Sequence, residues 1–222
     1  MKRRLVLVGI VTFIILAIPV RLLLAEGHFR SPTKDTACYK SVNNNCYDNY
    51  GVQVSASADS SGRCNPDAVG YIGWDLGIAD PDYNRTWSSA TLTLTAYSVT
   101  GGEPPFTFAL YAPDNHDWTE DGMALGYGGT AIATATVPSL AVDGVVTFES
   151  DALGAYFLGL KGGDASLAVV MTGGCGAQSA TVVFEDVEGT GNLYAPSSAK
   201  EADLVFLTES NLKIYLSFIT GG

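Results

Sequence analysis

Basic side chains are scarce in this sequence. The 222 residues include 12 Lys and Arg against 23 Asp and Glu, which gives a formal net charge of −11. Four of the basic residues lie within the first 21 positions, so the rest of the chain is more acidic still. A protein of this charge repels phosphate backbones and anionic lipids. We therefore expect no nucleic-acid partner, and membrane contact only through the N-terminal segment.

Histidine is also rare, and this restricts the chemistry that the chain can support. The two histidines are His28 and His116, and the second lies in an acidic stretch. A Ser-His-Asp triad would have to use His116, and no serine occupies the Gly-x-Ser-x-Gly turn that presents a nucleophile. Carboxylates are plentiful, but glycoside cleavage needs two at a defined separation. The sequence predicts that the protein is not an enzyme.

Long apolar runs are confined to the N-terminus. Positive residues at 2–4 precede an apolar run at 5–20, and Arg21 separates this run from Leu22–Ala25. The pattern is that of an export segment over residues 1–25, either a cleaved signal peptide or an uncleaved membrane anchor. Both alternatives place residues 26–222 outside the cytoplasm, because the positive flank stays inside. We expect a secreted or cell-surface protein.

The cysteines are few, and all of them follow the export segment. An even number of cysteines in an exported chain predicts disulfides. Of the three possible pairings we favour Cys38–Cys46 with Cys64–Cys175. The alternative is a zinc site, but these spacings do not match the usual zinc motifs, and no histidine clusters with the cysteines.

No long helical pattern is visible, and the apolar residues recur mostly at every second position. In 91–97, for example, leucines alternate with threonines, which suit the wet face of a strand. Glycine-rich turns such as 100–105 and 189–192 separate such runs. Only Ser150 to Leu160 has helical spacing. These features predict an all-β sandwich or barrel that forms a single domain over 26–222, with an additional C-terminal strand at 211–220.

Five motifs in this order resemble the DNRLRE domains, a family of extracellular β-sandwich modules related to carbohydrate-binding modules of polysaccharide lyases. The motifs are Asn49-Tyr50-Gly51, Tyr71 to Gly77, Ser89 to Leu94, Trp118-Thr119-Glu120 and Ser198 to Ala202. The four cysteines and the tail after Thr208 are additions to the family pattern. The resemblance implies a jelly-roll-like antiparallel β-sandwich without catalytic machinery, found on surface and secreted proteins.

Three acidic loops predict a structural calcium site, because hard cations bind several oxygen ligands. None of the loops has EF-hand spacing, and acidic residues in turns are alternatively solvated or cap the turn. The candidate ligands are Asp80, Asp82, Asp114, Asp117, Glu185 and Asp186.

Several aromatic residues lie next to polar turns, where their rings can stack on the C–H faces of sugars. For Trp74 and Trp118 we favour packing in the core instead. The candidate ligand-binding residues are Trp87, Tyr83, Tyr111 and Tyr127.

Two functions fit these observations. The first is a non-catalytic module that binds extracellular polysaccharide. The alternative is a structural subunit of an extracellular filament, sheath or surface layer, whose partners are copies of itself. In that case the tail donates a strand to a neighbour's open sheet edge. The apolar side chains of that strand are Leu212, Ile214, Leu216 and Phe218.

Overall fold

The computed structural model of the chain describes residues 25–30, 32–40, 45–47, 51–77, 86–120, 126–176, 179–185 and 202–209. Residues 1–24 and the predicted strand 211–220 lie outside these ranges. The described elements are β1 (Ala25–Arg30), β2 (Lys34–Tyr39), β3 (Asn45–Tyr47), β4 (Val52–Ala58), β5 (Cys64–Asp75), β6 (Thr86–Thr100), β7 (Phe106–Pro113), β8 (Tyr127–Val137), β9 (Val145–Ser150), α2 (Asp151–Gly159), β10 (Asp164–Gly173), β11 (Ala180–Phe184) and β12 (Asp203–Glu209).

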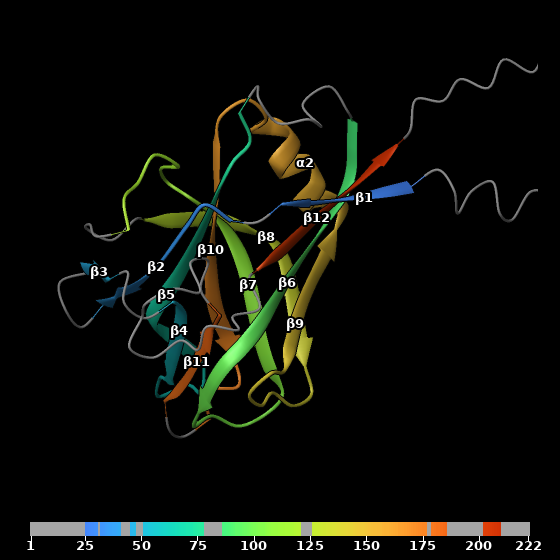
Figure 1. The fold of residues 1–222 in the computed structure, drawn as a ribbon. Helices are drawn as coiled ribbons and strands as arrows, with labels where there is room; N and C mark the ends of the chain where they lie inside the picture. Colours follow the sequence, from blue (N-terminus) through green and yellow to red (C-terminus); the bar gives the residue numbers. More distant parts are fainter. Residues whose placement is uncertain are drawn as a thin grey trace, which may run out of the picture.

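The strands form one curled sheet in the order β1-β12-β6-β11-β4-β5-β10-β7-β8, with β2 and β9 attached to β5 and β6, and β3 attached to β2 (Figure 1). Every ladder is antiparallel. The long strand β6 holds the curl together, because its first part pairs with both β12 and β9 and its last part pairs with β11. The all-β prediction is confirmed, with a single continuous sheet enclosing the core.

The core lies inside this curl and follows from the alternation in the sequence. In β6, Leu92 and Leu94 are buried, whereas the intervening Thr93 is partly exposed. This alternation is expected of strands that present one face to the core and the other to solvent. The largest fully buried side chains of the chain include Trp74, Phe108, Phe148, Phe157, Phe184 and Phe206.

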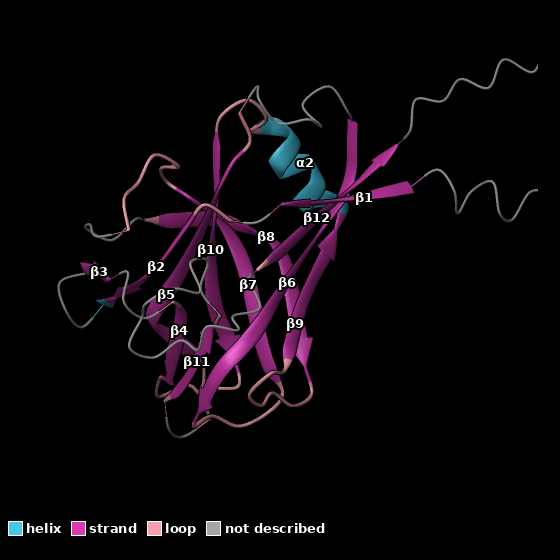
Figure 2. Ribbon diagram, in the orientation of Figure 1, coloured by secondary structure: helices cyan, strands magenta, loops and turns pink. Residues whose placement is uncertain are grey.

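A single helix in the described residues, α2, covers one end of the core (Figure 2). It begins after Ser150, whose Oγ accepts a hydrogen bond from the Leu153 N–H at 3.0 Å. This is the usual N-cap arrangement, and it satisfies one of the free N–H groups of the first turn. The side chains of Leu153 and Phe157 are fully buried. The helix predicted between Ser150 and Leu160 is therefore confirmed.

Gly154 sets how closely α2 approaches β6. A Cβ atom at this position would lie 2.6 Å from the Ser89 Cα and 2.8 Å from its carbonyl carbon, so the obstacle is backbone. Glycine to alanine normally stabilises a helix by about 1 kcal/mol. Here we expect Gly154→Ala to lower the free energy of unfolding by about 1–3 kcal/mol, because the helix has to move away.

Gly159, in the same helix, provides the control, because a Cβ there meets nothing within 4 Å. Gly159→Ala should leave the free energy of unfolding unchanged or raise it by up to about 1 kcal/mol. Urea unfolding of both variants measures the difference. If both variants are equally stable, α2 does not pack on β6 as described.

Two disulfides are present, with the predicted pairing. Cys38–Cys46 joins β2 to β3 at directly opposed positions of the ladder, and its partners are 8 residues apart in sequence. Cys64–Cys175 joins the start of β5 to the segment after β10 and spans 111 residues. Both disulfides are compatible with an oxidising environment. Among the described helices, none is long and apolar enough to cross a membrane.

Candidate functional site

A row of residues on the outer face of the sheet brings two tyrosines toward each other. Ala168 of β10 lies opposite Tyr71 of β5 on one side and opposite Tyr111 of β7 on the other. All three point away from the core. Their neighbours along the three strands, Ile72, Leu167 and Leu110, belong to the main core, and successive side chains of a strand point to opposite faces. The small side chain of Ala168 leaves room for aromatic rings on both sides. The outer face therefore carries a second, smaller apolar cluster.

Tyr111 and Tyr127 form a pair at the exposed side of this cluster. Their ring centroids are 5.3 Å apart and the planes are tilted by 47°. Both rings are partly buried. Burial is the main factor that raises the pKa of Tyr127, and Tyr111 adds to it. Neutral hydroxyl groups at the edge of apolar rings can donate and accept hydrogen bonds while the ring faces exclude water.

Asp114 directly follows β7 and is held against Gly126, the residue before Tyr127. Its N–H donates to the Gly126 carbonyl oxygen at 2.8 Å. A Cβ atom on Gly126 would be 2.0 Å from the Asp114 Oδ2, so the carboxylate lies directly over this glycine. Burial chiefly raises the pKa of Tyr71, with contributions from Tyr127 and Asp114, which places these groups in one electrostatic neighbourhood. We call Tyr111, Tyr127 and Asp114 the tyrosine patch.

Trp118 closes the buried side of the cluster. It is 7% exposed and packs edge-on against Tyr71, with ring centroids 6.3 Å apart. Its Nε1–H donates to the Ser166 Oγ at 2.8 Å. The expected packing role of Trp118 is confirmed, and so is that of Trp74, which is 1% exposed. Trp74 belongs to the main core and Trp118 to the outer-face cluster, and both side chains are buried.

Lys34 fastens the loop after β7 to the sheet. Its Nζ donates to the carbonyl oxygens of His116 at 2.9 Å and Trp118 at 3.1 Å, and contacts the Asp164 Oδ2 at 3.4 Å. It also lies 4.8 Å from the centre of the Trp118 ring. Burial and then Lys34 lower the pKa of His116. The sequence did not single out Lys34, because its partners are more than 80 residues away in the chain.

Trp87 is not on the surface, so its prediction as a ligand-binding residue is wrong. It is 2% exposed and stacks on Phe206, with centroids 4.2 Å apart and planes 9° apart. In the ladder between β6 and β12, Ser89 pairs with Leu207, and Trp87 pairs with the next residue, Thr208. The residue between Ser89 and Trp87 is therefore an extra one without a partner position on β12. Such a bulge reverses the inward and outward alternation. Trp87 therefore points inward. The other predicted ligand-binding residue of this region, Tyr83, lies outside the described residues.

The predicted calcium ligands are only partly described. Asp114 and Asp117 are both exposed, and the Asp117 N–H donates to Asn115 Oδ1 at 3.0 Å within the loop. Glu185 is buried, and its N–H donates to the Thr95 carbonyl oxygen at 2.9 Å. Asp80, Asp82 and Asp186 lie outside the described ranges. No group of three or more acidic, His or Cys side chains suited to a metal occurs within those ranges. Calcium binding stays a prediction.

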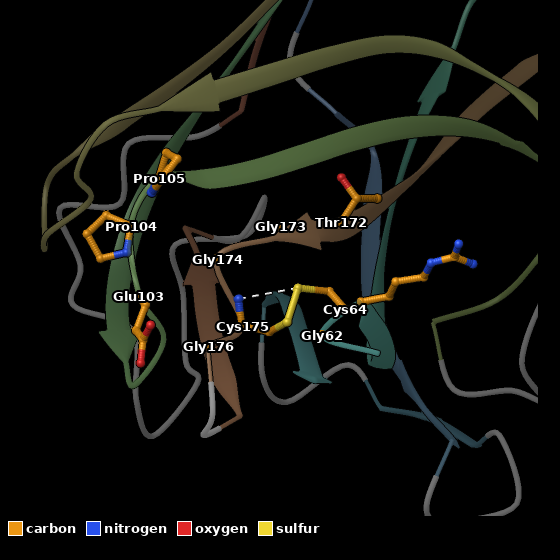
Figure 3. Close-up of a pocket in the computed structure, with 11 residues that line it drawn as sticks. Gly62, Cys64, Glu103, Pro104, Pro105, Thr172, Gly173, Gly174, Cys175 and Gly176 are labelled. Carbon is orange, nitrogen blue, oxygen red and sulfur yellow. Dashed lines mark hydrogen bonds between the residues drawn. A yellow bond between two sulfur atoms is a disulfide. The ribbon is translucent and has the colours of Figure 1, made fainter. Parts of the chain in front are cut away.

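A shallow groove of about 600 Å³ lies around the Cys64–Cys175 disulfide (Figure 3). Glu103 and the two prolines that follow it line one side, and the disulfide lines the other. The Cys175 N–H donates to the Cys64 Sγ at 3.3 Å. The remaining lining is four glycines with Arg63 and Thr172, and it includes no aromatic ring on which a ligand could stack.

Neither a scan against protein-family models nor a search of curated proteins finds a significant match to this chain. The resemblance to DNRLRE domains therefore stays a prediction.

Proposed function

We propose that this protein is a non-catalytic, extracellular module that binds polysaccharide through the tyrosine patch. The observation that supports the proposal is the Tyr111–Tyr127 pair, because two residues predicted as ligand contacts and 16 positions apart in sequence come together on one face. Partly exposed aromatic rings with polar edges are suited to pyranose rings, whose C–H faces are apolar and whose rims carry hydroxyl groups. The two disulfides fit a secreted or cell-surface location.

Replacing the two tyrosines tests the proposal. We expect Tyr111→Ala and Tyr127→Ala each to weaken polysaccharide binding about three- to tenfold, since an aromatic contact contributes about 0.5–1.5 kcal/mol. Affinity electrophoresis against a broad panel of polysaccharides measures the loss. Tyr97→Ala is the matched control, because Tyr97 is a partly exposed tyrosine on β6, several strands away in the sheet order. The proposal fails if no polysaccharide in the panel retards the unmodified protein.

The alternative proposal, a structural subunit of an extracellular filament, sheath or surface layer, is favoured by the ends of the sheet. Within the described ranges, β8 pairs only with β7, and β1 pairs only with β12. Strands with one free edge can accept a strand from another molecule. Four buried apolar side chains of a donated tail, Leu212, Ile214, Leu216 and Phe218, would contribute roughly 6–12 kcal/mol before ordering costs.

Truncation of the chain after Ser210 tests this alternative. If the tail is donated between subunits, the truncated protein should remain a folded monomer while the full-length exported domain assembles into large particles. Light scattering and negative-stain microscopy distinguish the two states. Assembly that persists in the truncated protein would rule out strand donation by the tail.

A further inference from the structure

We propose that the tyrosine patch selects uncharged polysaccharides over those that carry carboxylate or sulfate groups. This inference rests on the proposed function and adds the class of ligand. Two features support it: the negative charge of Asp114 next to the rings, and the hydrogen bonds that Lys34 already makes within the protein.

The charge next to the rings is negative. Asp114 is exposed, and its Oδ2 lies over Gly126, one residue before Tyr127. The electrostatic influence of Asp114 reaches Tyr71, beneath the patch. Asp117 is exposed in the same loop. An anionic glycan on the rings would therefore meet the Asp114 carboxylate, which lies next to Tyr127. A sugar hydroxyl, in contrast, can donate a strong hydrogen bond to the Asp114 carboxylate.

The nearest cation is not available to a ligand. Only 16% of the Lys34 side chain is exposed, and its Nζ already contacts two carbonyl oxygens and the Asp164 carboxylate. Binding of a glycan carboxylate would require that these contacts break, and the loop around Trp118 depends on them. The positive charge of Lys34 is therefore neutralised by groups of the protein itself.

The other cations with described side chains lie elsewhere. Lys161 lies over the Trp87 ring, 5.0 Å from its centre, and Arg63 lines the groove at the Cys64–Cys175 disulfide. Lys40 follows β2, and both β5 and β10 separate β2 from Tyr111. With strands about 4.8 Å apart and about 3.3 Å per residue, Lys40 is roughly 20 Å from Tyr111, beyond the screening length of about 8 Å in physiological salt. Among the basic residues whose side chains the structure describes, none borders the patch with its charge free.

Matched pairs of polymers that differ only in charge provide the test. Hydroxyethyl cellulose is compared with carboxymethyl cellulose, and dextran with carboxymethyl dextran, in affinity electrophoresis with the intact exported domain. We expect the neutral member of a bound pair to bind at least about fivefold more tightly in low salt. The preference should shrink as salt is raised, because salt screens the repulsion by Asp114.

The variant Asp114→Asn keeps the shape of the side chain and removes its charge. We expect it to reduce the discrimination between the two members of a pair by about fivefold, whereas Asp203→Asn, on the exposed side of β12, should leave it unchanged. Charged polymers that bind as tightly as neutral ones, with both interactions weakened in Tyr111→Ala, would overturn this inference but leave the proposed function intact. Failure of every polymer in the broad panel would overturn both.

Discussion

Replacing Cys64 and Cys175 together by alanine is expected to lower the free energy of unfolding by about 5 kcal/mol. The same change at Cys38 and Cys46 is expected to cost about 2.5 kcal/mol. The difference follows from the length of chain that each disulfide closes, 111 residues against 8. A crosslink removes conformational freedom from the unfolded chain, and the loss grows with the logarithm of the loop length. Urea unfolding of the two double variants measures both values.

The comparison between the two disulfides is more informative than either value alone. Each double variant is the control for the other, because both remove one buried or partly buried bridge from the same sheet. Equal losses of stability would contradict the chain-entropy argument. They would indicate that packing around the sulfur atoms, and not the length of the loop, determines what each bridge contributes.

Phe157→Ala is expected to lower the free energy of unfolding by about 3–5 kcal/mol. Phe157 is fully buried, and its ring packs edge-on against Trp74 of β5 at 5.3 Å and Phe206 of β12 at 5.4 Å. The side chain therefore joins α2 to two strands that do not pair with each other. Alanine leaves a cavity between the rings of Trp74 and Phe206, which belong to two different strands, and such a site collapses only in part.

Leu158→Ala is the control for Phe157→Ala. Leu158 is the next residue in α2, and it is 37% exposed. Its replacement should change stability by no more than about 0.5 kcal/mol. A loss below about 1 kcal/mol in Phe157→Ala, measured under the same conditions, would mean that α2 is not anchored through this ring.

Much of the fold follows from local patterns in the sequence. The alternation in 91–97 and the helical spacing at 150–160 each predicted the right element, because each pattern reflects one face turned toward the core. The pairing Cys64–Cys175 was favoured over its alternatives and is present. Trp87 was predicted on the surface because it follows a polar turn, but a bulge in the ladder with β12 turns it inward, and no local pattern reveals the bulge.

The candidate site was less predictable than the fold. Tyr111 and Tyr127 were each chosen for residue type and polar surroundings, but their proximity depends on the register of β7 with β8, which is irregular between Leu110 and Ala112. The role of Ala168 as a spacer depends on two ladders at once. Contacts of this kind are set by pairing between distant segments, and a single sequence does not specify that pairing.

The pairing of β1 with β12 also determines how the molecule responds to mechanical tension. The two strands are antiparallel, and Ala25 lies opposite Glu209 at one end of the ladder. A force that pulls residue 25 away from residue 209 therefore acts across the hydrogen bonds and breaks them one pair after another, like a zipper. Strands pulled along their length would instead break all pairs together. The ladder that joins the first and last described strands is therefore loaded pair by pair, and β12, whose Phe206 is buried in the core, connects this load to β6.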